Sequence, residues 1–211
     1  SNNIPNHEFN DNSANFADDV AEVAHTFIVS KSPQLADSIT ELNHTSYDGV
    51  MLNGVPVDLL SAGCYSPSSH GANADGHTAI GCSDDAAWLI DPMSPLHNNF
   101  FGADMHNAHT QPDGAYHYHG SPEAMFDDNP GTNGSPVIGF AADAFPIYGS
   151  YFLDPETGQV RKAQSSYTLK QGNRPGPDDT NPGGVYDGTY ESDWEFTASG
   201  DLDQCNGMTV N

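Results

Sequence analysis

Short apolar runs separated by turn-forming residues dominate the chain, and several of them alternate between apolar and polar positions. Residues 49–60 (GVMLNGVPVDLL) predict two strands joined at Asn53-Gly54, a dipeptide typical of tight hairpins. Residues 116–119, 137–143 and 145–152 are rich in aromatic and β-branched side chains and read as further strands. This pattern predicts a mainly β fold.

Two stretches near the N-terminus carry helical spacing instead. Apolar residues recur on one helical face from Phe16 to Phe27, although residues 26–30 fit a strand equally well. Ser32-Pro33, followed by apolar residues at 35, 39 and 42, predicts a second short helix with proline at its first position. We therefore expect a few short helices beside the strands.

Long loops rich in glycine and proline fill the intervals between these elements. Residues 64–85 and 171–189 are the longest of them, and a last strand is expected over residues 190–196. After a loose polar segment at residues 1–15, we expect a single domain over residues 16–211, built as a β-sandwich-like or mixed sheet.

Acidic residues greatly outnumber basic ones: 29 Asp and Glu stand against 5 Lys and Arg, for a formal net charge of -24. Binding to a phosphate backbone requires clustered basic residues, so this composition excludes nucleic acid as a partner. No apolar run approaches the ~18 residues of a membrane-spanning helix, so membrane insertion is not expected. We expect a secreted or periplasmic protein whose signal peptide has been removed.

The three cysteines match no CxxC metal or redox motif. Cys64 and Cys82 flank a loop rich in Gly, Ser and Asn, and a disulfide between them is the plainest interpretation. Cys205 is then either free or paired within a C-terminal segment that this sequence lacks.

Five of the ten histidines fall within residues 97–119. His117 and His119 alternate with two tyrosines, so in a strand both imidazoles lie on one face and both phenol rings on the other. Same-face neighbours on a strand are about 6.5–7 Å apart, so these two imidazoles can converge on one cation. His106 and His109 would share a face if their loop formed a helical turn.

Imidazole ligands suit copper or zinc, whereas calcium prefers oxygen ligands. The alternative is that these histidines are buried and hydrogen-bonded without a metal, while the tyrosines pack in the core. Acidic loops at residues 127–129 and 178–187 offer oxygen ligands for calcium, but they do not follow the spacing of an EF-hand.

Three sequence blocks resemble, in the same order, the YHYH-domain family. They are DGAYHYHGSP (113–122), PVIGFAADAFPIYGSY (136–151) and GTYESDWEF with GDLDQCNG (188–207). Ala144 stands where the family usually has a glycine after Asp143. The resemblance implies an exported protein with a suspected role for a metal, especially copper, and a chain that continues beyond Cys205 to another cysteine.

Asp143 comes just before Phe145-Pro146, where the proline forces a sheet edge or a bend. Its carboxylate is expected either to bind a metal or orient a histidine, or to accept hydrogen bonds from its own turn.

Three functions follow from these observations. The first is an exported protein that binds copper, or zinc as second choice, through His117 and His119, aided by His106, His109 and Asp143. The second is a secreted metalloenzyme on the same residues, either a zinc hydrolase or a copper oxidase. The third is an extracellular structural module stabilised by calcium in its acidic loops.

Overall fold

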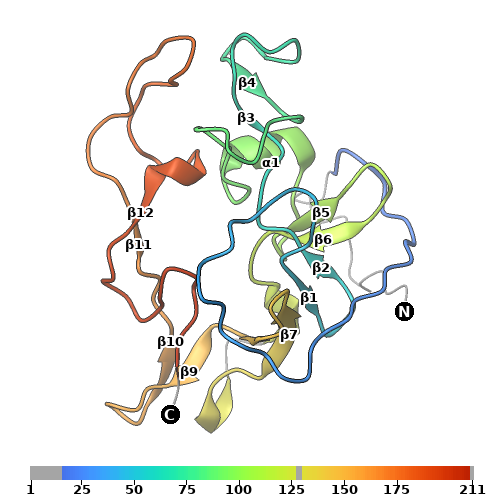
Figure 1. The fold of residues 1–211 in the computed structure, drawn as a ribbon, viewed down its shortest axis with the longest axis vertical. Coiled ribbons are helices and arrows are strands. Elements are labelled where there is room, and N and C mark those ends of the chain that lie inside the picture. The colour runs from blue at the N-terminus through green and yellow to red at the C-terminus, as the bar shows by residue number, and fades with distance from the viewer. Residues whose placement is uncertain (1–15, 127–129, 210–211) are drawn as a thin grey trace. The chain divides into compact units, whose positions relative to one another are not determined.

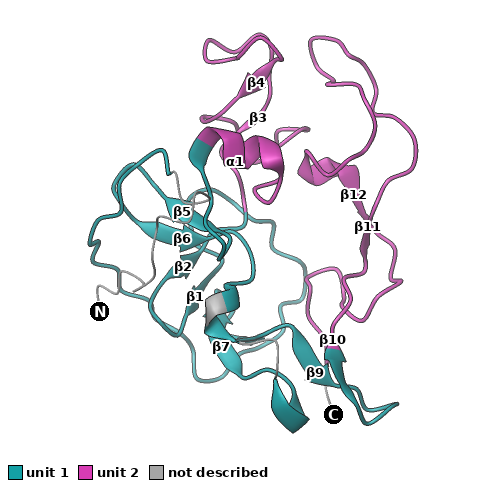
Figure 2. Cartoon of the chain, turned by 180° about the vertical axis from the view of Figure 1, so that it is seen from behind, with its two compact units in different colours: residues 1–59, 101–161 teal, residues 60–100, 162–211 magenta. Residues whose placement is uncertain are grey.

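The computed structural model describes residues 16–126 and 130–209, so the loose segment expected at residues 1–15 lies outside the described residues. The chain divides into two compact units (Figure 2). Unit 1 comprises residues 1–59 and 101–161, and unit 2 comprises residues 60–100 and 162–211. The expectation of a single domain over residues 16–211 stays a prediction, and each unit is described by itself below.

A six-stranded mixed sheet forms the framework of unit 1 (Figure 1). Its strands are, in chain order, β1 (Gly49–Met51), β2 (Pro56–Val57), β5 (Ala108–Thr110), β6 (Tyr116–Tyr118), β7 (Val137–Ala141) and β8 (Pro146–Tyr148). The order across the sheet is β5-β6-β2-β1-β7-β8, with β2 and β6 parallel and the other pairs antiparallel. The prediction of a mainly β fold with a mixed sheet is therefore confirmed.

The hairpin predicted at Asn53-Gly54 joins β1 to β2. Met51 donates its backbone N–H to the carbonyl of Val55 across the turn, at 2.9 Å. Gly54 has φ +87°, a conformation that glycine adopts without a steric penalty. The side chain of Asn53 accepts the N–H of Val55 at 3.1 Å, which fixes the turn further.

The apolar core of unit 1 lies against this sheet. Its buried members come mostly from the strands and are Met51, Val55, Val57, Ala108, Tyr116, Tyr118 and Ile138. The two tyrosines that alternate with His117 and His119 thus pack in the core, as one interpretation of the sequence expected.

Both predictions of a helix near the N-terminus are wrong. Residues 16–48 contain no helix or strand, and the alternative strand at 26–30 is not formed either. Ala17 and Ala21 donate their N–H groups to Phe101 and Gly114, at 2.9 and 3.0 Å, instead of to a helical turn. Leu35, on the apolar face of the second predicted helix, is 87% exposed. Short helices are marginal without a packed apolar face, which explains why the spacing alone did not produce one.

Smaller elements complete unit 1. β9 (Tyr151–Leu153) pairs with β10 (Val160–Lys162), and the predicted turn at 154–158 connects them. Two short 3-10 turns, η1 (Glu123–Met125) and η2 (Gly131–Asn133), precede β7.

Unit 2 consists mostly of loops with its own small core of Trp88, Ile90 and Tyr190. Its elements are β3 (Cys64–Tyr65), β4 (His77–Thr78), α1 (Pro95–Phe101, whose last residue belongs to unit 1), β11 (Tyr167–Leu169), η3 (Glu191–Asp193) and β12 (Trp194–Phe196). The hairpin β3–β4 lies within residues 64–85, which the sequence indicated as loop alone, and α1 was not predicted. None of the helices in the described ranges is long and apolar enough to cross a membrane.

Candidate metal centre

The hairpin β5–β6 gathers histidines on one face of the unit 1 sheet. Its register sets His109 directly opposite His117. Residues opposite one another in an antiparallel pair have their side chains on the same face, and His119 follows His117 by two positions. The hairpin turn is closed by bonds from Gln111 to Ala115 (3.0 Å) and from Gly114 to Gln111 (2.8 Å). Three imidazoles are therefore presented by two adjacent strands.

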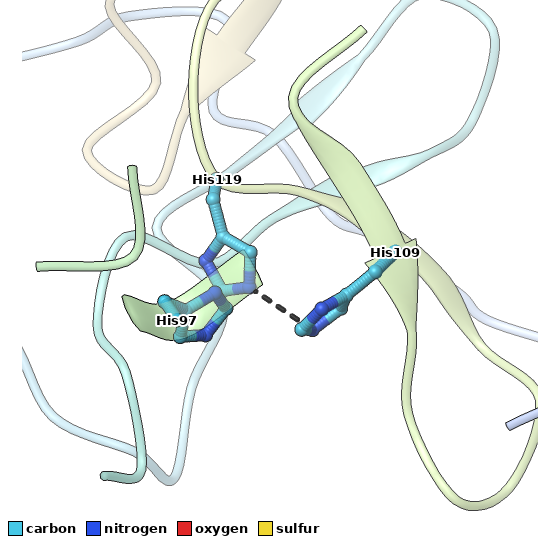
Figure 3. A group of neighbouring side chains, drawn as sticks. All are labelled: His97, His109 and His119. Atoms are coloured by element: carbon cyan, nitrogen blue, oxygen red, sulfur yellow. Dashed lines mark hydrogen bonds between the residues drawn. The ribbon is translucent and has the colours of Figure 1, made fainter. Parts of the chain in front are cut away.

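In these three histidines, which we call the triad, Nε2 of His119 contacts the Nε2 atoms of the other two rings. Nε2 of His119 lies 3.1 Å from Nε2 of His117 and 3.2 Å from Nε2 of His109, and Figure 3 marks the second of these contacts. Two nitrogens on one copper or zinc ion, with bonds of about 2.0–2.1 Å, are separated by about 3.3–3.6 Å. The spacing is within a few tenths of an ångström of what two ligands of one ion require.

Hydrogen bonds to backbone carbonyls fix the tautomers of two triad members. Nδ1 of His117 lies 3.2 Å from the carbonyl oxygen of Ala115, and Nδ1 of His109 lies 3.1 Å from that of Gly102. A carbonyl oxygen only accepts, so Nδ1 carries the proton in both rings and each neutral imidazole presents a lone pair at Nε2. Metal-binding histidines are typically oriented in this way by a carbonyl on their other nitrogen.

A count of protons shows that hydrogen bonds alone do not satisfy the triad. Nε2 of His119 faces the Nε2 lone pairs of both His109 and His117 but carries at most one proton. At most one of the two contacts can therefore be a hydrogen bond, and in the other contact two nitrogen lone pairs face each other. A cation that accepts all three lone pairs removes this conflict.

The triad is buried, and in two of its members burial favours the neutral form that metal binding requires. His117 is 1% exposed, His109 6% and His119 8%. Burial lowers the pKa of His117 to about 3, and the neighbouring His109 acts in the same direction. Burial also lowers the pKa of His109, against the opposing effect of its bond to the Gly102 carbonyl.

The sequence placed five residues in the candidate site, and the structure brings three of them together: His109, His117 and His119. His106 is buried, and its backbone N–H donates to Oδ1 of Asp104 at 2.8 Å. The helical turn expected to pair it with His109 is absent, because His109 lies in β5 and Asn107 before it has φ +60°.

Asp143 is exposed and lies in the turn between β7 and β8. Its Oδ1 accepts the backbone N–H of Phe145 at 3.1 Å, which is the turn-forming role that the sequence analysis set against a ligand role. Ala144, where the family usually has glycine, has φ +72°, so the glycine of that motif matches the left-handed conformation that the turn needs.

Figure 3 also draws His97, a histidine whose ring nitrogen could act as a metal ligand. His97 is 2% exposed and is carried by α1, in unit 2. The sequence analysis counted it in the histidine-rich segment without assigning it a role. A proline after Ser94 was the signal for α1, since proline favours the first helical position.

The disulfide predicted between Cys64 and Cys82 is confirmed, and Cys205 is an exposed free cysteine.

In the acidic loop 178–187, Asp178 accepts hydrogen bonds from Thr180 and Asn181, and Asp187 pairs with Arg174. The residues proposed for calcium at 127–129 lie outside the described residues.

A family model described as YHYH protein matches residues 26–211. No curated protein matches the chain, and no solved structure matches it.

Proposed function

The chain belongs to the YHYH protein family, and on this basis we propose that it is an exported metal-binding protein whose ion is held by His109, His117 and His119. Copper is the expected ion and zinc the second choice. The observation that carries the proposal is the contact of buried His119 Nε2 with the Nε2 atoms of His109 and His117, where the two contacts share at most one proton.

Ligand chemistry supports copper or zinc over a hard cation. All three triad ligands are neutral imidazoles, which suit copper, zinc, iron and nickel. Calcium and magnesium prefer oxygen ligands, and the triad contains none. Among divalent ions of the first transition row, copper binds nitrogen sites most tightly, which places it ahead of zinc.

Export is supported by two properties of the chain. The disulfide between Cys64 and Cys82 is of a kind that persists in oxidising compartments. The formal net charge of -24 keeps a protein soluble and attracts cations toward it.

Metal titration of purified, metal-free protein tests the proposal. The wild-type chain is expected to bind one equivalent of copper, and X-ray absorption is expected to show nitrogen ligands. His117→Gln and His119→Gln should each lower the affinity by more than the roughly 10–100-fold that is typical of losing a partner outside the coordination sphere, since each removes a ligand from the ion.

His106→Gln is the matched control, because His106 is a buried histidine of the same segment outside the triad. It is expected to bind metal as the wild type does. Unchanged metal content in the double variant His117→Gln/His119→Gln would reject the assignment, with circular dichroism used to verify that the variants fold.

A further inference from the structure

Asp104 is a buried carboxylate that the metal centre itself does not use. It is 5% exposed and lies before β5. Its Oδ1 accepts the backbone N–H groups of His106 at 2.8 Å and Ala108 at 3.2 Å, and its Oδ2 accepts the phenol O–H of Tyr116 at 2.5 Å. A short bond of this kind to an ionised acceptor is among the strong hydrogen bonds in proteins.

The contacts of this one side chain reach the residues that precede two of the triad members, through the backbone of Ala108 and the phenol of Tyr116. Ala108 precedes His109 in β5, and Tyr116 precedes His117 in β6. Asp104 therefore links β5 to β6 through residues on either side of the pair formed by His109 and His117.

His119 is connected through the same turn. The turn from Asp104 to Ala108 is closed by bonds from Asp104 N–H to the Ala108 carbonyl (2.9 Å) and from Asn107 N–H to the Asp104 carbonyl (3.1 Å). The carbonyl of Asn107 accepts the N–H of His119 at 2.8 Å. The conformation of this turn thus fixes the backbone of the third triad member.

From these contacts we infer that Asp104 is the positioning residue of the centre, which holds the three imidazoles in convergence and whose buried negative charge favours a cation there. Only the second part of this inference, the effect of the Asp104 charge on a bound cation, rests on the proposed function. The triad ligands are all neutral, so a cation within them brings an uncompensated positive charge into a buried site. Partners that orient metal ligands from outside the coordination sphere are typically worth about 10–100-fold in metal affinity.

Two substitutions separate the charge of Asp104 from its shape. Asp104→Asn retains Oδ1 for the two backbone N–H groups, replaces the acceptor of the Tyr116 O–H by an amide NH2 that can donate to the phenol oxygen, and removes the charge. It is expected to lower copper affinity about 10-fold or more. Asp104→Ala removes the turn contacts as well, and it is expected to lower the affinity further and to abolish the ring contacts of the triad. The second effect is measured on metal-free protein, as the loss of nuclear Overhauser contacts between the rings of His109, His117 and His119.

Asp154→Asn is the matched control. Asp154 is also a buried aspartate of unit 1 (6% exposed), and its Oδ1 accepts the N–H of Glu156 at 2.8 Å in another turn. This substitution is expected to lower the melting temperature without changing copper affinity or the ring contacts.

The results distinguish the inference from the function on which it rests. If the wild type binds copper and both Asp104 variants bind it as Asp154→Asn does, the inference is overturned and the proposed function stands. If the wild type binds no metal, the proposed function fails, and the ring contacts in metal-free Asp104→Ala decide the positioning role by themselves: retained contacts overturn it.

Discussion

At the scale of single residues, the titration of His117 makes metal-free stability depend on pH. Burial lowers the pKa of this imidazole to about 3 in the folded protein, whereas an unfolded histidine titrates near 6.5. The unfolded chain therefore binds the proton first, so stability is lost as pH falls from about 6.5 toward 3 and is unaffected above that window. One such group contributes a slope of at most about 1.4 kcal/mol per pH unit.

Urea denaturation of metal-free protein at several values between pH 7.5 and pH 4 measures this dependence. His117→Gln is expected to show a shallower loss of stability than the wild type, because glutamine does not titrate. Parallel curves for the two proteins would show that His117 titrates normally in the folded state.

The sequence identified part of the triad for a sound physical reason. Alternation along a strand is a local property, so the shared face of His117 and His119 followed from Tyr116–His119 alone. The partner His109 depended on the register of two strands, and His106 was favoured beside it only by assuming a helical turn. The role of Asp104 had no local signal, because one of its partners, Tyr116, lies 12 residues away along the chain. Its other partners, His106 and Ala108, are close in sequence.

At the scale of elements, the disulfide is expected to stabilise the β3–β4 hairpin of unit 2. It connects residues 18 apart in sequence and so closes a loop that contains both strands. Loop-closure entropy in the unfolded chain makes such a crosslink worth about 3 kcal/mol. Reduction with a phosphine is expected to lower the free energy of unfolding of unit 2 by up to that amount.

Tryptophan fluorescence reports this loss, because both tryptophans, Trp88 and Trp194, belong to unit 2. Cys64→Ala/Cys82→Ala should already show the lower stability and should not respond to the reductant. A wild-type denaturation midpoint that is insensitive to reduction would contradict the prediction.

Elements with strong turn chemistry were predictable, and those that depend on tertiary contacts were not. The β1–β2 hairpin follows from Asn53-Gly54, whose left-handed glycine is demanded by the turn. Residues 16–48 carried helical spacing, yet their N–H groups at Ala17 and Ala21 bond to distant carbonyls. Helical spacing of apolar residues predicts that one face of the segment is buried. Whether the segment forms a helix depends on the rest of the fold, which must supply a surface for that face to pack against.

At the scale of the whole molecule, charge repulsion is the dominant long-range force. The chain has 29 acidic residues and 5 basic ones, and two of the basic residues are already engaged in ion pairs, Arg161 with Asp154 and Arg174 with Asp193. Net charge far from zero destabilises a compact state through self-repulsion, and salt screens that repulsion. Stability is therefore expected to increase with ionic strength.

The measurement is the melting temperature of metal-free protein at neutral pH between 0.02 and 0.5 M sodium chloride, concentrations over which the screening length falls from roughly 20 Å to below 5 Å. The melting temperature is expected to rise over this range, because repulsion among many acidic groups outweighs the weakening of the ion pairs made by Arg161 and Arg174. A variant with several exposed aspartates replaced by asparagine should start higher at low salt and respond less. A melting temperature that falls with added salt would contradict the prediction. It would show that the ion pairs of Arg161 and Arg174 stabilise the fold by more than repulsion among the acidic residues destabilises it.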